Sequence, residues 1–166
     1  MKTPSKLTFI ALSLFLAACG SSWVSFPKAS SIYTQKARQF SPPPGRAALY
    51  VIRPNQFVAA GSPITVFIDH NKFGRLPPPS FIYAEIMPRE HLLELAEMGG
   101  AGSTSIRFKA EEGKCYFYLA EVKFSVPASM HLELLPEKKG KELVNTYEQS
   151  AYNEYDYGQK VPTLPK

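Results

Sequence analysis

The chain has 166 residues, 45% of them hydrophobic, and a formal net charge of +5. The part of the chain that we predict to fold, residues 45–145, is large enough for one hydrophobic core but not for two. Residues 1–18 contain Lys2, Lys6 and no acid, so the net charge falls to +3 without them, and the basic side chains are scattered along the chain. This charge pattern argues against a nucleic-acid partner.

The N-terminus has the pattern of an export signal. Lys2 and Lys6 precede an apolar run over residues 7–18, interrupted only by Thr8 and Ser13. The run is 12 residues long, whereas a helix needs about 20 residues to cross a bilayer. We therefore interpret residues 1–18 as a signal peptide and not as a membrane span.

The residues Leu16, Ala17 and Ala18, followed by Cys19, end this signal. They resemble the lipobox of bacterial lipoprotein precursors. The resemblance implies cleavage between Ala18 and Cys19 and a covalent lipid on the Cys19 thiol, with acyl chains such as palmitate. Gly20 after the cysteine implies sorting to the outer membrane, facing the periplasm. Cleavage after Gly20, which would release an unlipidated protein, is the alternative.

Residues 19–44 are predicted to form a lipidated, flexible tether. The segment is rich in serine and proline, and it ends in three consecutive prolines at positions 42–44. Proline runs favour extended backbone and disfavour helices and central strands. We expect this segment to separate the membrane from the folded domain.

Short segments with strand character follow from residue 47 onward. They are 47–53, 64–69, 72–76, 81–86, 105–110, 115–122 and 130–135. The segment 105–110 alternates most clearly, with Ile106 and Phe108 on one face and Arg107 and Lys109 on the other. This pattern predicts a mainly β domain over residues 45–145, built as an antiparallel sandwich or barrel, and a Tyr-rich C-terminal tail over residues 146–166.

Residues 89–98 permit two interpretations. Pro88 stands near the start, strong helix formers follow, and Gly99 comes after the end, so local rules favour a helix. His91, Leu93 and Leu95 also alternate with their neighbours, so a strand stays open.

Several different short motifs follow one another along the domain. They occupy residues 45–54, 66–69, 73–76, 81–83 and 112–116, together with Pro88 and His91. In this order they resemble a bacterial lipoprotein family catalogued as domain of unknown function 2846 (DUF2846), over most of residues 45–135. Arg89 stands where the family has glycine. The resemblance implies a small immunoglobulin-like or transthyretin-like β-sandwich with a strand after His91, and no known activity.

The titratable side chains show no catalytic or metal-binding pattern. His70, His91 and His131 lack the spacing of a zinc motif, and lipidation of Cys19 would leave Cys115 as the only thiol, without a disulfide partner. We interpret His70 as a turn residue and His91 as a hydrogen-bonding corner residue. Asp69 is interpreted as a turn acceptor. We expect no catalytic residue, no metal and no cofactor besides the lipid.

Tyr116 and Tyr118 lie on one face of a predicted strand and are the candidate interaction surface. Tyrosine offers a large contact area with a polar tip, which suits protein or sugar recognition. The alternative is that a second sheet or the C-terminal tail covers them.

The function predicted from these features is a lipid-anchored envelope module that binds another envelope protein or plays a structural role. A small-ligand or glycan-binding protein is the first alternative. An envelope hydrolase or thiol enzyme that uses Cys115 or a histidine is the second, and it requires a histidine within about 3–4 Å of the thiol.

Overall fold

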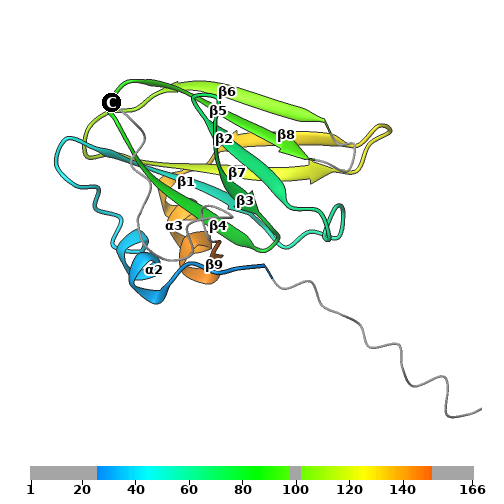
Figure 1. The fold of residues 1–166 in the computed structure, drawn as a ribbon, viewed down its shortest axis with the longest axis horizontal. Coiled ribbons are helices and arrows are strands. Elements are labelled where there is room, and N and C mark those ends of the chain that lie inside the picture. Colours follow the sequence, from blue (N-terminus) through cyan, green and yellow to red (C-terminus); the bar gives the residue numbers. More distant parts are fainter. Residues whose placement is uncertain (1–25, 98–101, 151–166) are drawn as a thin grey trace, which may run out of the picture.

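Two β-sheets pack face to face to form the core of the domain (Figure 1). The computed structural model describes residues 26–97 and 102–150. One sheet has five strands in the order β8-β7-β1-β4-β9, and the other has four in the order β3-β2-β5-β6. The strands are β1 Ala47–Arg53, β2 Ile64–Ile68, β3 Asn71–Leu76, β4 Ser80–Ile86, β5 Glu90–Glu97, β6 Ser103–Lys109, β7 Cys115–Lys123, β8 Ser129–Leu134 and β9 Glu148–Gln149. The predicted mainly β sandwich is confirmed.

Most neighbouring strands run antiparallel, as the sequence predicts, but two pairs are parallel. β1 lies between β4, which is antiparallel to it, and β7, which is parallel to it. The short strand β9 pairs in parallel with β4 at the edge of the same sheet. The five-stranded sheet is therefore mixed.

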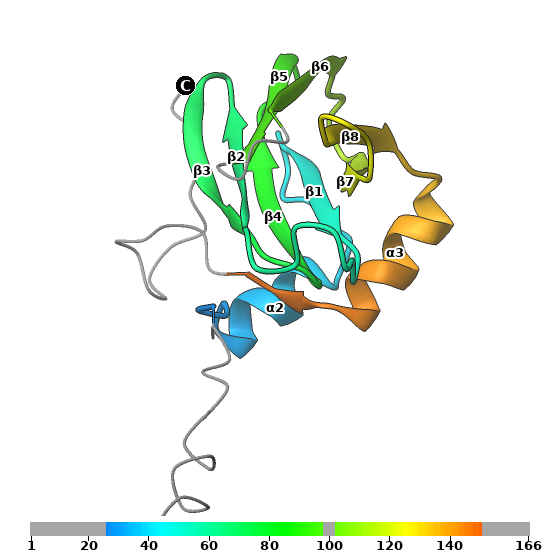
Figure 2. The same cartoon turned by 90° about the vertical axis from the view of Figure 1, so that its right-hand side faces the viewer.

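Two helices cover the outer face of the five-stranded sheet (Figure 2). They are α2 Ser31–Ala37 and α3 Glu137–Thr146. Beneath them lies an aromatic layer in which the Tyr50 ring is 5.2 Å from that of Tyr83 and 4.7 Å from that of Phe117, between centroids. Gly140 of α3 comes so close to Phe117 that an added Cβ would lie 2.2 Å from the ring. Because both faces are covered, β1 is buried at every position.

The four-stranded sheet is covered on one face only. Its strand β2 alternates between buried and half-buried positions, and β6 alternates between half-buried and exposed ones. In β6, Ile106 and Phe108 point inward and Arg107 and Lys109 are exposed, as their alternation predicts. On each strand, the alternate side chains that face the other sheet complete the core.

Residues 90–97 form strand β5 and not a helix. Their helix-forming composition is overridden by burial, because His91, Leu93 and Leu95 face the core on alternate positions. β5 also pairs with β2 on one side and with β6 on the other, which satisfies its backbone groups. The strand implied by the DUF2846 resemblance is confirmed.

The predicted tether is wrong over its second half, because residues 31–37 form α2 and pack on the domain. Ala37 is fully buried, and its carbonyl accepts a hydrogen bond of 2.7 Å from the Tyr50 hydroxyl. The Arg38 side chain donates to the carbonyls of Val144 (3.3 Å) and Tyr147 (2.9 Å). The segment is poor in apolar residues and Ile32 is exposed, yet Ala37 docks on the aromatic layer.

The predicted C-terminal tail is also wrong at its start, because residues 148–149 form β9. Ser150 donates its backbone N–H to the carbonyl of Phe81 (2.8 Å), and the N–H of Ala29 donates to the carbonyl of Gln149 (2.9 Å). The segments before α2 and after α3 thus meet at one edge of the five-stranded sheet. The rest of the predicted tail lies outside the described residues.

Candidate functional site

The predicted lipidation residue Cys19, with Leu16, Ala17 and Ala18, lies outside the described residues. The lipid anchor therefore stays a prediction. In the part of the chain that the structure describes, no helix is long and apolar enough to span a membrane. The first described residues are joined to the domain, because Lys28 forms a β-bridge with Ser150 and the N–H of Ala29 donates to the carbonyl of Gln149.

The predicted tyrosine surface is wrong for Tyr118, which is buried between the sheets. Tyr116 and Tyr118 both pack against Phe108 of β6, with ring centroids 5.4 and 5.3 Å away. Burial raises the pKa of Tyr118 to about 12. Tyr116 is half-buried, and its hydroxyl accepts a 3.0 Å hydrogen bond from the N–H of Glu111. The second sheet covers this strip, which was the alternative interpretation.

Cys115 is half-buried at the start of β7. Its Sγ donates a hydrogen bond of 3.4 Å to the carbonyl of Phe40. Burial raises the pKa of the thiol, which keeps it protonated at neutral pH and weakens it as a nucleophile. Within residues 26–97 and 102–150, no three side chains of His, Cys, Asp or Glu are placed to hold a metal ion.

A hydrogen-bonded polar corner closes one end of the sandwich, which we call the polar end. Asp69 and His70 both have positive φ, 52° and 64°, and form the tight turn between β2 and β3. The Asp69 carboxylate accepts hydrogen bonds from the backbone of Leu92 (2.9 Å) and the side chain of Arg89 (3.1 Å). It also lies 2.8 Å from Nδ1 of His91. Asp69 and His70 therefore take the turn positions predicted for them.

His91 has a fully buried ring with an acceptor at each nitrogen. Nε2 lies 2.8 Å from the carbonyl of Met87, opposite the contact between Nδ1 and Asp69. Burial raises the pKa of the Asp69 carboxyl. The hydrogen bonds from Leu92 and His91, and the charges of His91 and Arg89, outweigh burial and hold that pKa below its ordinary value. This corner fixes the entry into β5 and has no open ligand position.

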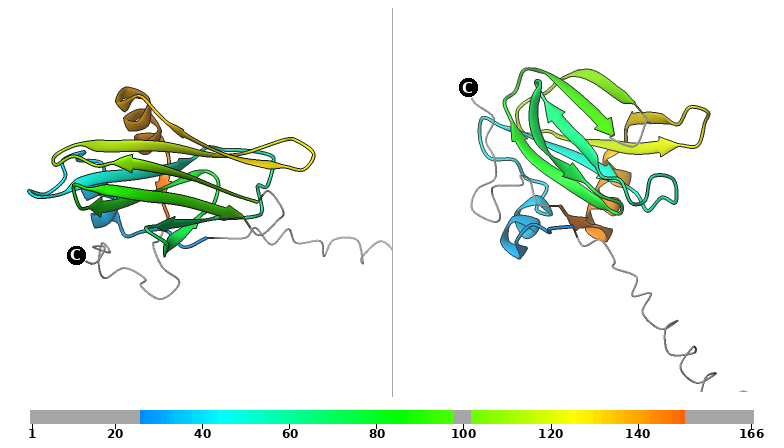
Figure 3. Two further views of the ribbon diagram at one scale, coloured as in Figure 1. Left: turned by 90° about the horizontal axis from the view of Figure 1, so that it is seen from above. Right: turned by 45° about the vertical axis from the view of Figure 1, so that its right-hand side comes forward.

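The opposite end of the sandwich, which we call the apolar end, carries three loops within residues 26–97 and 102–150. These are residues 54–63 between β1 and β2, 77–79 between β3 and β4, and 124–128 between β7 and β8. The strand registers place them together, because Arg53 pairs with Ser80. The β7–β8 hairpin extends furthest, since β7 pairs with β1 only as far as Leu119 but with β8 as far as Lys123 (Figure 3).

Large apolar side chains stand in solvent at this end. Phe57 in the β1–β2 loop is 98% exposed, and Phe124 and Val126 in the β7–β8 loop are 85% and 95% exposed. The β1–β2 loop contacts strand β7 close to the β7–β8 loop, because the N–H of Val122 donates to Oε1 of Gln56 at 3.2 Å. Figure 1 shows both loops at the same end of the molecule.

The β1–β2 loop is held in place by Arg53, whose side chain is fully buried. The guanidinium donates to the carbonyls of Ser62 (2.7 Å), Leu76 (3.1 Å) and Ala59 (2.8 Å). A buried arginine is costly unless its donors are satisfied. Arg53 thus ties the loop to the end of β3 and fixes the backbone that carries Phe57.

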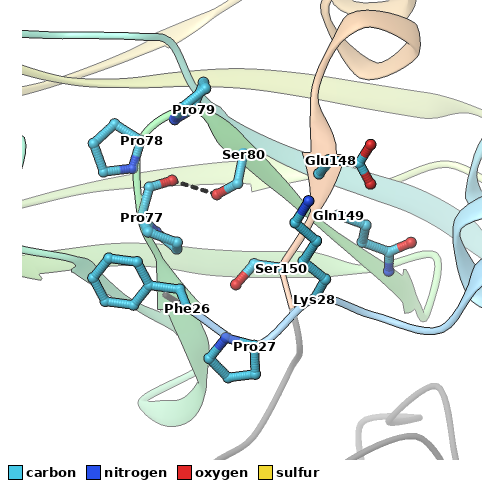
Figure 4. A pocket seen from close by; sticks show the side chains of 10 residues that line it. All are labelled: Phe26, Pro27, Lys28, Pro77, Pro78, Pro79, Ser80, Glu148, Gln149 and Ser150. Atoms are coloured by element: carbon cyan, nitrogen blue, oxygen red, sulfur yellow. Dashed lines mark hydrogen bonds between the residues drawn. The ribbon is translucent and has the colours of Figure 1, made fainter. Parts of the chain in front are cut away.

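An open cleft of about 330 Å³ lies beside the apolar end (Figure 4). Its walls are Phe26, Pro27, Lys28, Pro77, Pro78, Pro79, Ser80, Glu148, Gln149 and Ser150. The hydroxyls inside it are engaged, because Ser80 donates to the carbonyl of Pro77 and Ser150 donates to the carbonyl of Arg75. In Figure 4 the Lys28 side chain reaches toward Ser80 and Glu148. The cleft offers a mostly apolar surface with one basic and one acidic side chain.

Sequence reasoning missed both the cleft and the exposed side chains. Phe57 follows Gln56 between two predicted strands, and Phe124 lies between Lys123 and Ser125, so both fall outside the periodic apolar segments. An aromatic residue inside a turn-forming stretch was the available signal. The cleft joins residues 26–28 to residues 148–150, which no local pattern brings together.

Residues 43–132 match the family described as "Protein of unknown function (DUF2846)". No curated protein matches the chain. The matched segment includes β1 to β7 and most of β8, with the polar end and all three loops of the apolar end.

Proposed function

This chain belongs to the DUF2846 family of proteins of unknown function, and on that premise we propose that it is a lipid-anchored envelope protein that binds a partner protein beside the membrane. In this proposal residues 1–18 are removed and Cys19 carries the lipid. The anchored domain lies on the periplasmic side of the bacterial outer membrane. Two or more acyl chains would hold it there stably.

The observation that carries this proposal is the short stretch between Cys19 and the folded domain. Phe26 already lines the cleft, seven residues after Cys19. Seven residues span at most about 25 Å when fully extended. A domain on so short a connection works at the membrane surface, where its partners must also lie.

The residues that line the cleft favour a peptide segment of the partner as the ligand. Five of its ten lining residues are proline or phenylalanine, and its two serine hydroxyls already donate to backbone carbonyls. A polar small molecule needs several converging polar groups, whereas a peptide can bury apolar side chains and place its charges on Lys28 and Glu148. We therefore place the partner segment in this cleft.

We propose that Cys115 is not a catalytic nucleophile, which agrees with a binding function for the protein. Burial raises the pKa of its thiol, and the Sγ is engaged by the carbonyl of Phe40. Both features oppose the thiolate that a nucleophilic cysteine requires.

The test is crosslinking in intact cells, followed by affinity capture of the full-length protein and mass spectrometry. The wild type, Cys19→Ala and the charge reversal Lys28→Glu are compared, and Lys138→Glu on exposed α3 serves as the matched control. We expect one protein to be captured with the wild type and with Lys138→Glu, and to be depleted with Lys28→Glu and Cys19→Ala. Recovery of the same proteins with all four chains would contradict the proposal.

A further inference from the structure

We propose that the apolar end inserts the side chains of Phe57, Phe124 and Val126 into the bilayer that anchors the chain. The inference rests on the proposed function, because it assumes lipidation at Cys19. It adds a second membrane contact, made by the folded domain itself, and therefore a fixed orientation of the sandwich.

The first argument is the grouping of exposed apolar side chains. Single exposed apolar residues are common, but a group at one place marks an interaction surface. Phe57, Phe124 and Val126 are each at least 85% exposed, and they lie on two loops at the same end of the sandwich. Gln56, next to Phe57, accepts a hydrogen bond from Val122, two residues before Phe124.

The second argument is that the loops hold these side chains outward. Arg53 fixes the β1–β2 loop through three backbone carbonyls. In the β7–β8 loop the Ser125 hydroxyl lies 2.6 Å from the carbonyl of Pro127 and 3.1 Å from the hydroxyl of Ser129. Polar groups of these loops are thus engaged within the domain, which lowers the cost of bringing the loops into a lipid interface.

The third argument is the position of the N-terminal segment. Phe26 lies in the cleft beside Pro77, Pro78 and Pro79, which form the β3–β4 loop of the apolar end. Lipid on Cys19 is at most about 25 Å of extended chain from Phe26. The connection therefore joins the domain at the end that carries the exposed apolar side chains.

Charge and shape favour lipid over a protein as the occupant. Lys123 is exposed at this end and can meet anionic headgroups, and the three loops at residues 54–63, 77–79 and 124–128 contain no acidic residue. The apolar side chains project from two narrow loops. A stable protein interface usually covers about 800 Å² on each partner, whereas insertion into a bilayer requires no matching surface.

The test places a single tryptophan at one chosen position of the lipidated protein, which is purified from membranes. The variants Phe57→Trp and Phe124→Trp are made in a Trp23→Phe background, which removes the native tryptophan. Leu134→Trp is the matched control, because Leu134 is 54% exposed at the far end of β8. Intact mass verifies the lipid on Cys19. Each chain is reconstituted in vesicles of phosphatidylethanolamine and phosphatidylglycerol, with and without brominated acyl chains.

We expect a shift of emission to shorter wavelength and loss of intensity with brominated lipid for Phe57→Trp and Phe124→Trp, but not for Leu134→Trp. Equal behaviour of all three variants, or emission unaffected by brominated lipid, overturns the inference. A chain that lacks the lipid overturns the proposed function instead, so the two failures are distinguishable. A shift in emission that requires added envelope protein and shows no quenching would assign the apolar end to a protein partner and likewise overturn the inference.

Discussion

The two ends of this sandwich use their loops in opposite ways. At the polar end, Asp69 gathers hydrogen bonds from His91, Arg89 and the backbone of Leu92. At the apolar end, Phe57 and Phe124 have 98% and 85% of their surface in solvent. The polar end stabilises the fold with groups that are already satisfied. The apolar end presents surface that the fold leaves uncovered.

This difference teaches where to look for function in a domain without a catalytic cluster. Side chains that complete each other's hydrogen bonds, as Asp69 and His91 do, are explained by folding. Side chains such as Phe124 contribute little to folding and are explained by something outside the domain. Stability and membrane contact should therefore respond to different substitutions.

The largest effect on stability is expected from Asp69→Ala at the polar end. The substitution removes the carboxylate from the buried ring of His91 and from the N–H of Leu92. We expect a loss of about 3 kcal/mol in the free energy of unfolding, because breaking one partner of a buried pair leaves the other uncompensated. Urea denaturation measures this loss. When Asp69→Ala is combined with Phe124→Trp, brominated lipid should still quench the tryptophan, because the folded protein keeps its apolar end.

Asp69→Asn is the control for this substitution. Asparagine tolerates the positive φ of position 69 and keeps an acceptor, so its loss should be smaller. Equal losses for alanine and asparagine would mean that neither the amide acceptor nor the tolerance of positive φ matters, and that the charge of the carboxylate alone stabilises this end.

A smaller loss, about 2 kcal/mol, is expected from Arg53→Met at the apolar end. Methionine fills much of the same volume but leaves the carbonyls of Ala59, Ser62 and Leu76 without the guanidinium. Because the loop is then released, the Phe57→Trp signal in brominated vesicles should also weaken. Thermal unfolding and lipid quenching of the same sample separate the two effects, and an unchanged Phe57→Trp signal would contradict the anchoring role of Arg53.

Acid should reduce the contribution of the polar end without removing it abruptly. The pKa of Asp69 is lowered in the folded protein, so its contribution to stability is present above the unfolded value of about 3.9. The contribution is lost as pH falls from about 4 through the lower pKa of the folded state. The difference in unfolding free energy between wild type and Asp69→Asn should therefore shrink below about pH 4. A difference that is independent of pH would contradict this account.

The smallest effect on stability is expected from Phe57→Ser combined with Phe124→Ser. Both side chains are exposed, so the free energy of unfolding should change by no more than about 0.5 kcal/mol. Partition of the unlipidated chain, starting at Gly20, onto phosphatidylglycerol-containing vesicles should nevertheless fall, and sedimentation with vesicles measures it. Leu134→Ser is the matched control and should leave partition unchanged. A large loss of stability in the double variant would place these phenylalanines in the fold after all.

The sequence predicts the parts of this molecule that rest on local pattern. Alternation in 105–110 gives the inward and outward faces of β6 correctly, and turn chemistry at Asp69 and His70 gives the β2–β3 hairpin. The sequence does not predict the features that depend on contacts between segments far apart in the chain. The helix-forming residues 90–97 become a strand because β2 and β6 pair with them, and Tyr118 is buried because Phe108 of the other sheet packs on it.

The candidate site was less predictable than the fold for the same reason. The serine- and proline-rich composition of residues 19–44 predicts a tether, whereas the contacts of Ala37 with the Tyr50 hydroxyl, of Lys36 with Glu85 and of Arg38 with Tyr147 place residues 31–38 in the domain. Phe57 and Phe124 lie far apart in the sequence. The parallel pairing of β1 with β7 places them at one end.

The most direct test of the account is the intact mass and N-terminal sequence of the mature protein extracted from membranes. Partner binding beside the membrane and insertion of the apolar end both require a chain that is anchored at Cys19, seven residues before Phe26. The account predicts an N-terminus at Cys19 with a diacylglyceryl group and further acyl mass on that residue. An unlipidated chain that begins at Ser21, after cleavage behind Gly20, would contradict it.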